Sequence, residues 1–102
     1  MRADQAYGCI RKQATVRIGL DFDGTYTRDP LLWDRFIAVA NEHGHEVICV
    51  TMRFEDESLA DFPCEVIYTA RKGKVGHMVK LGRPIDIWID DNPQWLLLDA
   101  AA

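Results

Sequence analysis

Four short apolar runs recur along the chain, and each stops at a turn or at polar residues. They are rich in Val, Ile and Leu and predict buried strands at residues 15–22, 46–50, 65–68 and 85–89. The runs are apolar at consecutive rather than alternate positions. This is the pattern of strands that are covered on both faces, as in a parallel sheet.

The segments between the runs have helical spacing. Asp29 followed by Pro30 predicts a helix start, and Gly44 is the expected residue just beyond its end. The apolar stripe of this helix consists of Leu32, Trp33, Phe36, Ile37 and Ala40.

Three further helical segments are expected. An acidic first turn is predicted at residues 55–58, and a short covering helix after Gln94. Between them, a helix is predicted from about residue 72 to Leu81. Its inward-facing residues are expected to be Val75, Met78, Val79 and Leu81.

This alternation of strands and helices predicts an α/β domain. We expect a Rossmann-like three-layer α/β/α architecture with a short, mostly parallel sheet joined by right-handed crossovers. The domain is predicted to span residues 15–102, after an N-terminal arm at residues 1–14 without clear periodicity. In such sheets ligands bind beyond the carboxyl ends of the strands.

Two carboxylates end the first strand. On a regular strand Asp21 and Asp23 would share one face, about 7 Å apart. They would repel each other unless a cation or a proton lay between them, which suits Mg²⁺. The pair also suits a division into nucleophile and general acid/base. The alternative is a simple turn, in which Gly24 supplies a positive φ. An EF-hand loop is excluded, because Tyr26 and Leu32 occupy the positions that require Gly and Glu.

Other polar residues follow the remaining strands in the same way. Thr51 follows the second strand, and Asp90 and Asp91 follow the fourth. Lys72 and Lys74 open the helix that leads to the fourth strand. Carboxyl ends of parallel strands meet at one edge, so these groups are expected to converge there.

In these residues the chain resembles the haloacid dehalogenase (HAD) superfamily of phosphohydrolases, over residues 16–93. Residues 18–25 (IGLDFDGT) match its first motif, hhhDxDxT. Thr51 matches the hydroxyl of the second motif, one lysine the third, and Asp90-Asp91 the acidic pair of the fourth.

The resemblance implies a role for each matching residue. Asp21 would be the nucleophile that forms an aspartyl-phosphate, and Asp23 the general acid/base. Mg²⁺ would bind Asp21, the Asp23 backbone carbonyl and Asp90, and Asp91 would orient the metal shell or the lysine. Thr51 and the lysine would hold the phosphoryl oxygens. The residues expected to bind substrate are Gly24, Thr25, Thr51, Arg53 and Lys72.

The identity of the lysine is open between two residues. Lys74 lies four residues before Met78, which places it in the first turn of the apolar-striped helix. Lys72 would lie half a turn earlier, at the rim. We therefore predict Lys74 as the phosphate-binding lysine.

No segment between the motifs is long enough for the cap domain usual in the family. The site is therefore expected to be open to large or small phosphorylated substrates: a nucleotide, a nucleic-acid end, a phosphoprotein or a small phosphate ester. No fifth strand is evident before Ala102. The fourth strand would then be an edge, covered by the tail or by a second subunit in a homodimer.

Composition argues against several other classes of protein. A net charge of −4 argues against a general nucleic-acid-binding surface. No run approaches the roughly 18 apolar residues of a membrane span, and residues 1–5 lack the apolar region of a signal peptide, so a cytoplasmic protein is expected. The three cysteines form no C-x-x-C pair.

Basic residues cluster near the expected site although the chain is acidic. We expect them to form a rim that attracts a phosphorylated ligand, with ordinary surface charge as the alternative. They are Arg28, Arg53, Arg71, Lys72 and Lys74.

The sequence thus predicts a capless, Mg²⁺-dependent phosphomonoesterase. Two alternatives stay open: a catalytically idle module that keeps the metal and phosphate site for binding or assembly, and phosphotransfer to an acceptor other than water.

Overall fold

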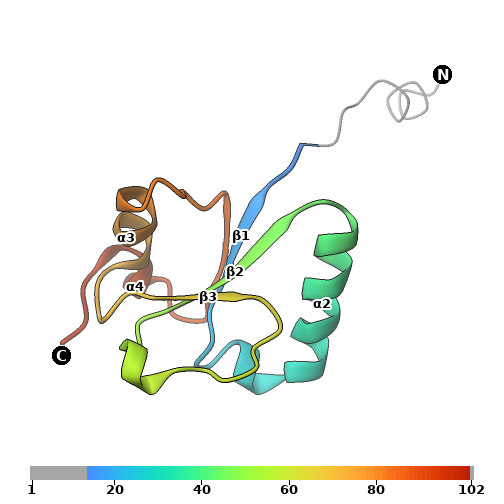
Figure 1. Ribbon diagram of the computed structural model, residues 1–102. Coiled ribbons are helices and arrows are strands. Elements are labelled where there is room, and N and C mark those ends of the chain that lie inside the picture. The colour runs from blue at the N-terminus through green and yellow to red at the C-terminus, as the bar shows by residue number, and fades with distance from the viewer. Residues whose placement is uncertain (1–13, 102) are drawn as a thin grey trace.

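Four parallel strands form a single sheet, in the order β3-β2-β1-β4 (Figure 1). The computed structural model describes residues 14–101. The strands are β1 (Arg17–Leu20), β2 (Glu46–Thr51), β3 (Glu65–Tyr68) and β4 (Ile87–Ile89). The predicted parallel α/β architecture is confirmed. The expected N-terminal arm falls almost entirely on residues 1–13, which lie outside the described part.

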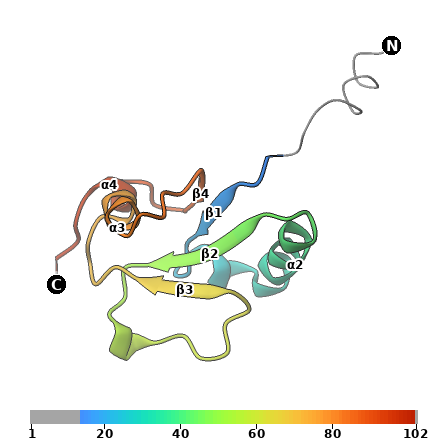
Figure 2. The same ribbon diagram turned by 45° about the horizontal axis from the view of Figure 1, so that its top comes forward.

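Helices cover both faces of this sheet. The α-helices are α2 (Pro30–Glu42), α3 (Lys74–Lys80) and α4 (Gln94–Leu97), and two 3₁₀ turns are η1 (Tyr26–Arg28) and η2 (Glu55–Glu57). Figures 1 and 2 show α2 on one side of the sheet and α3 with α4 on the other. No helix among the described residues is both long enough and apolar enough to span a membrane.

The core is divided between the two faces because side chains alternate along a strand. Val47 of β2 packs toward α2, in a cluster with Ile18, Leu20, Ile37 and Ala40. The next residue, Ile48, packs on the opposite face with Val50 of β2 and Met78 of α3. The apolar runs of the sequence therefore serve two cores.

The ends of α2 lie where the sequence predicts them. The Asp29 carboxylate accepts a hydrogen bond from the Leu32 amide at 3.2 Å, and Pro30 occupies the first helical position. At the other end, Gly44 has φ +81°, a conformation that favours glycine.

Three details differ from prediction. Val79 and Leu81 are exposed, at 57% and 49%, because the buried face of α3 is the one that carries Lys74 and Met78, four residues apart. Leu32 is 52% exposed, at the first turn of α2. The acidic segment at residues 55–58 forms only a 3₁₀ turn, since Ser58 is already extended.

The connections set the position of a crevice. The chain runs outward from β1 through β2 to β3, then returns to the other side of β1 as β4. This reversal places a topological switch point between the carboxyl ends of β1 and β4, where ligands bind in sheets of this type. Among residues 14–101 the sheet has four strands, so β4 is an edge, with Ile87 49% exposed.

Candidate functional site

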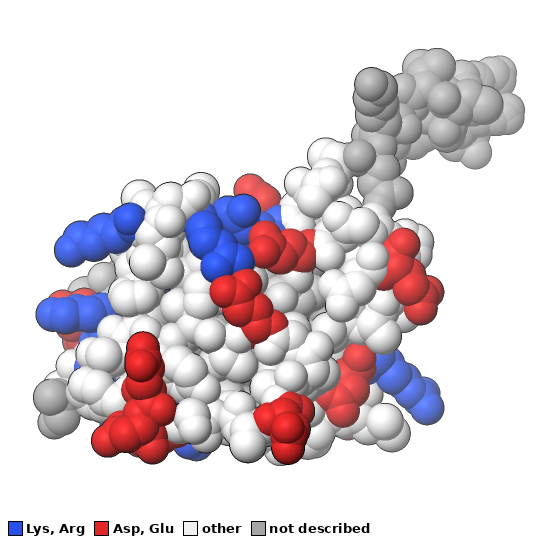
Figure 3. All heavy atoms as spheres, in the orientation of Figure 1, with Lys and Arg blue, Asp and Glu red and all other residues white. Residues whose placement is uncertain are grey.

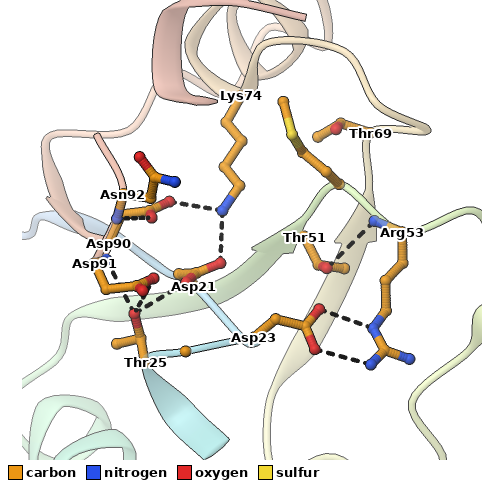
Figure 4. A network of polar contacts seen from close by, with 12 residues as sticks. Asp21, Asp23, Thr25, Thr51, Arg53, Thr69, Lys74, Asp90, Asp91 and Asn92 are labelled. Atoms are coloured by element: carbon orange, nitrogen blue, oxygen red, sulfur yellow. Dashed lines mark hydrogen bonds and ion pairs between the residues drawn. The ribbon is translucent and has the colours of Figure 1, made fainter. Parts of the chain in front are cut away.

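Asp21 lies at the switch point, directly after β1. Its amide donates to the Ile89 carbonyl at 2.9 Å, which fixes the residue against β4. The residue is 7% exposed. Its two carboxylate oxygens have different partners: Oδ1 accepts from Lys74 Nζ at 2.8 Å, and Oδ2 accepts from the Thr25 hydroxyl at 2.9 Å (Figure 4). The carboxylate is therefore held in one orientation.

Lys74 links the ends of β1 and β4. It is the first residue of α3 and is 3% exposed, and its Nζ donates to Asp90 Oδ2 at 2.7 Å as well as to Asp21. The side chain of Lys72 is instead 68% exposed, and its Nζ lies 3.8 Å from Asp99. The structure brings Lys74 into the site and leaves Lys72 outside it.

Thr25 connects Asp21 with Asp91. Its hydroxyl accepts a hydrogen bond from the Asp91 amide at 3.1 Å and also lies 3.3 Å from Asp91 Oδ1. A Cβ added to Gly24, which has φ +88°, would lie 2.5 Å from Asp91 Oδ2, so only glycine fits there. Gly24 and Thr25, expected to bind substrate, are thus placed to support the carboxylates. The motif includes Thr25 but does not indicate that its hydroxyl contacts Asp91.

Asp23 lies in the turn after β1 and lines the same cavity as Asp21. The chain leaves the strand at Asp21 and turns, so Asp23 projects toward Arg53 (Figure 4). Arg53 donates from Nε at 3.0 Å and from Nη2 at 2.9 Å, one bond to each carboxylate oxygen. The guanidinium also lies 5.1 Å above the centre of the Phe22 ring. The Asp23 side chain is still 59% exposed.

Three carboxylates are close enough to share a cation. One oxygen from each of Asp21, Asp90 and Asp91 lies within 4.8 Å of the others. Asp23, a predicted ligand through its backbone carbonyl, does not add its side chain to this group. Oxygen ligands of this kind are the ones that Mg²⁺ prefers.

The electrostatics of the acidic residues follow from burial. Burial raises the pKa of Asp21 to about 6, although the hydrogen bond from Lys74 opposes this shift. The pKa of Asp91 is lowered by its hydrogen bonds with Asp21 and Thr25. The pKa values of Asp21 and Asp91 are thus shifted in opposite directions, as expected for two neighbouring carboxyls that share one proton.

These residues line a cavity of about 360 Å³, which we call the acidic cavity. Thr51, at the end of β2, lines it too, and its Oγ accepts from the Arg53 amide at 3.3 Å. The predicted site residues that meet there are Asp21, Asp23, Thr51, Arg53, Lys74, Asp90 and Asp91.

Part of the wall of this cavity consists of residues that the sequence motifs do not include. Met52 and Asn92 follow the motif residues directly, whereas Trp95 and Ala100 come from α4 and the segment after it. The absence of a side chain at Gly73 allows α4 and the segment after it to approach the site. A Cβ there would lie 2.9 Å from the Leu97 carbonyl oxygen, so α4 can pack closely on the start of α3.

The expected basic rim is only partly assembled. Arg53, Arg71 and Lys74 line the acidic cavity, while Arg28 lines a neighbouring cavity with Trp33. Lys72 lies in neither. Acidic and basic side chains are interspersed on the face shown in Figure 3. In the acidic cavity four carboxylates face three cationic side chains, which leaves an excess negative charge.

Comparisons of this chain with protein-family models, with curated proteins and with solved structures give no match.

Proposed function

We propose that this protein is a Mg²⁺-dependent phosphomonoesterase of the HAD type, without a cap, acting on a phosphorylated substrate. One observation carries the proposal. A buried carboxylate, Asp21, is oriented at a strand end between an ammonium and a hydroxyl, beside two further carboxylates. A fixed, partly desolvated carboxylate in an open cavity is suited to nucleophilic attack.

The first step transfers the phosphoryl group to Asp21. A carboxylate oxygen of Asp21 forms a bond to phosphorus while the bond to the leaving oxygen breaks, and Asp23 gives that oxygen a proton. Thr51 and Lys74 donate to the phosphoryl oxygens, on which negative charge develops. Both line the same cavity as Asp21.

The second step regenerates Asp21. Asp23 takes a proton from water, the water oxygen bonds to phosphorus, and the bond to Asp21 breaks to release phosphate. For both steps Asp23 must exchange its two bonds with Arg53 for contact with the substrate or water. Its exposed side chain has room for this movement.

The residues fit a divalent cation. Asp21, Asp90 and Asp91 would hold it, since their oxygens already lie close together and the cavity carries excess negative charge. When bound, Mg²⁺ neutralises charge as an anionic phosphate ester approaches these carboxylates.

A binding module without catalysis is the second candidate. The bidentate pair of Arg53 with Asp23 favours it, because both oxygens of the proposed acid/base are occupied. Such a module would keep the metal and phosphate site for recognition or assembly.

Release of phosphate from p-nitrophenyl phosphate separates the two candidates. We expect release that requires Mg²⁺ and is lost in Asp21→Asn. Asp61→Asn is a matched control, because Asp61 lies in an exposed loop and asparagine tolerates its positive φ of 53°. If the folded wild type binds Mg²⁺ and phosphate in calorimetry but releases no phosphate from this ester or from a panel of phosphorylated metabolites, the binding module is correct.

A further inference from the structure

The loop after β3 holds the backbone of Ala70 and Arg71 in a strained conformation. Ala70 and Arg71 have φ of 53° and 71°, in the left-handed region that side chains other than glycine rarely adopt. Backbone hydrogen bonds hold this conformation: Ala70 donates to the Arg53 carbonyl at 3.2 Å, and Arg71 donates to the Met52 carbonyl at 2.9 Å. Strain of this kind persists where the surroundings impose it, and it is concentrated at functional sites.

The Arg71 side chain is also held in place. Nη1 donates to the Met52 carbonyl at 2.7 Å, and the guanidinium lies 5.0 Å above the centre of the Phe54 ring. Nη2 lies 3.4 Å from Glu57 Oε1, which is long for a charged hydrogen bond. A guanidinium has five N–H donors, and among residues 14–101 these contacts use two. Arg71 therefore keeps free donors in a fixed position.

The other two cations of the acidic cavity are already neutralised. Lys74 lies between two carboxylates at 2.8 and 2.7 Å, and Arg53 donates to both oxygens of Asp23. Within the described residues, Arg71 contacts one carboxylate, that of Glu57, at 3.4 Å. Arg71 is thus the cation of this cavity with unused capacity for an anion.

We infer that Arg71 binds a second anionic group of the substrate. The inference rests on the proposed function and deepens it: the substrate is a phosphate monoester that carries a further oxyanion, a carboxylate or a second phosphate, away from the ester. The cavity volume of about 360 Å³ is in the range of small-molecule sites, roughly 300–1,000 Å³. Met52 and Trp95 line it and offer apolar contacts for the body of such a molecule.

Matched aryl phosphates test the inference. We compare 3- and 4-carboxyphenyl phosphate with the corresponding carbamoylphenyl phosphates, which have nearly the same shape but lack the second charge. For the wild type we expect kcat/KM to favour the acid by about tenfold or more in at least one pair. Equal kcat/KM values in both pairs would overturn the inference whatever the variants show.

Three variants test whether Arg71 causes the preference for the acid over the amide. Arg71→Gln should bring the acid-to-amide ratio close to one, and Arg71→Lys should keep part of it, because lysine retains the charge without the planar fork. Arg28→Gln, which removes a cation of the neighbouring cavity, should keep the full ratio. A ratio unchanged in folded Arg71→Gln, with thermal melting as the check on folding, would assign the preference elsewhere and reject the inference.

A binding measurement separates this inference from the proposed function. The 3- and 4-carboxybenzylphosphonates and their carbamoyl counterparts cannot be hydrolysed as esters, and calorimetry gives their affinities in the presence of Mg²⁺. An Arg71-dependent preference for the acids without any ester hydrolysis would support Arg71 and reject the phosphatase. Ester hydrolysis by a protein that shows no preference for the acids would support the phosphatase and reject the role of Arg71.

Discussion

Lys74 Nζ lies 2.8 Å from Asp21 Oδ1, although 53 residues separate the two along the chain. The same ammonium lies 2.7 Å from Asp90 Oδ2, so one cation joins the residues that follow β1 and β4. All three side chains are less than 10% exposed. Removing one member of such a cluster leaves a buried charge without its partner, which is costly.

Lys74→Met should therefore lose both stability and activity. We expect destabilisation of about 3–5 kcal/mol in metal-free buffer, measured by urea unfolding, and a loss of about 100-fold or more in phosphate release. Lys72→Met is the matched control, because that lysine is exposed, and it should change the unfolding free energy by less than about 0.5 kcal/mol. A larger loss of turnover in Lys72→Met would reverse the assignment of the two lysines.

Thr25→Val tests whether the Thr25 hydroxyl organises the carboxylates. Valine keeps the shape of the side chain but leaves the Asp91 amide without its acceptor, so we expect destabilisation of about 1–3 kcal/mol and slower phosphate release. Thr27→Val is the control: its hydroxyl accepts from the Gly24 amide at an exposed position, so the cost should be below about 1 kcal/mol. Similar costs for both variants would contradict the special role of Thr25.

The stability of the metal-free protein should depend on the protonation of Asp21. Its folded pKa of about 6 exceeds the ordinary value of 3.8, because burial disfavours the charged form. The stabilising contribution of its proton is complete below pH 3.8 and is lost as pH rises through 6. Urea unfolding at pH 4 and pH 8, in EDTA, should thus show Asp21→Asn gaining stability relative to the wild type at the higher pH. A difference that does not change with pH would mean that Asp21 is not perturbed.

Mg²⁺ should stabilise the folded protein through the three clustered carboxylates. At about 100 times the dissociation constant, binding to the folded state alone adds about 2.7 kcal/mol, which thermal melting detects. Asp90→Asn removes one ligand charge from the cluster and should abolish most of the shift in Tm. Asp61→Asn should keep the shift. An equal shift in Asp90→Asn would place the ion elsewhere.

Two glycines with open surroundings should respond to alanine in opposite ways. A Cβ at Gly76 or at Gly82 meets no atom within 4 Å, but Gly76 lies within α3 whereas Gly82 has φ +73°. Gly76→Ala should stabilise the protein by about 0.5–1 kcal/mol, and Gly82→Ala should destabilise it by about 1–2 kcal/mol. Urea unfolding of both variants measures the difference, and a shift of the same sign in both would contradict the backbone explanation.

The sequence was sufficient for the parallel sheet and for the neighbourhood of the site. Continuous apolar runs such as that of β2 require cover on both faces, and parallel strands bring their carboxyl ends to one edge. Those two rules are enough to predict that Asp21, Thr51 and Asp90 lie together. Helical phase likewise favoured Lys74 over Lys72, because Lys74 lies four residues before Met78 and residues at this spacing share one face of a helix.

The tertiary structure decided how these groups pair. Asp23 pairs with Arg53 in the turn that follows β1, which ends at Leu20, and spacing on a regular strand cannot show where the backbone turns. Thr25 supports Asp91 across 66 positions of the chain, and the loop at Ala70 and Arg71 takes a left-handed form that short-range preferences oppose. Side-chain chemistry and periodicity determined which residues gather at the edge of the sheet. Which of them share a hydrogen bond depends on packing and on contacts between distant segments.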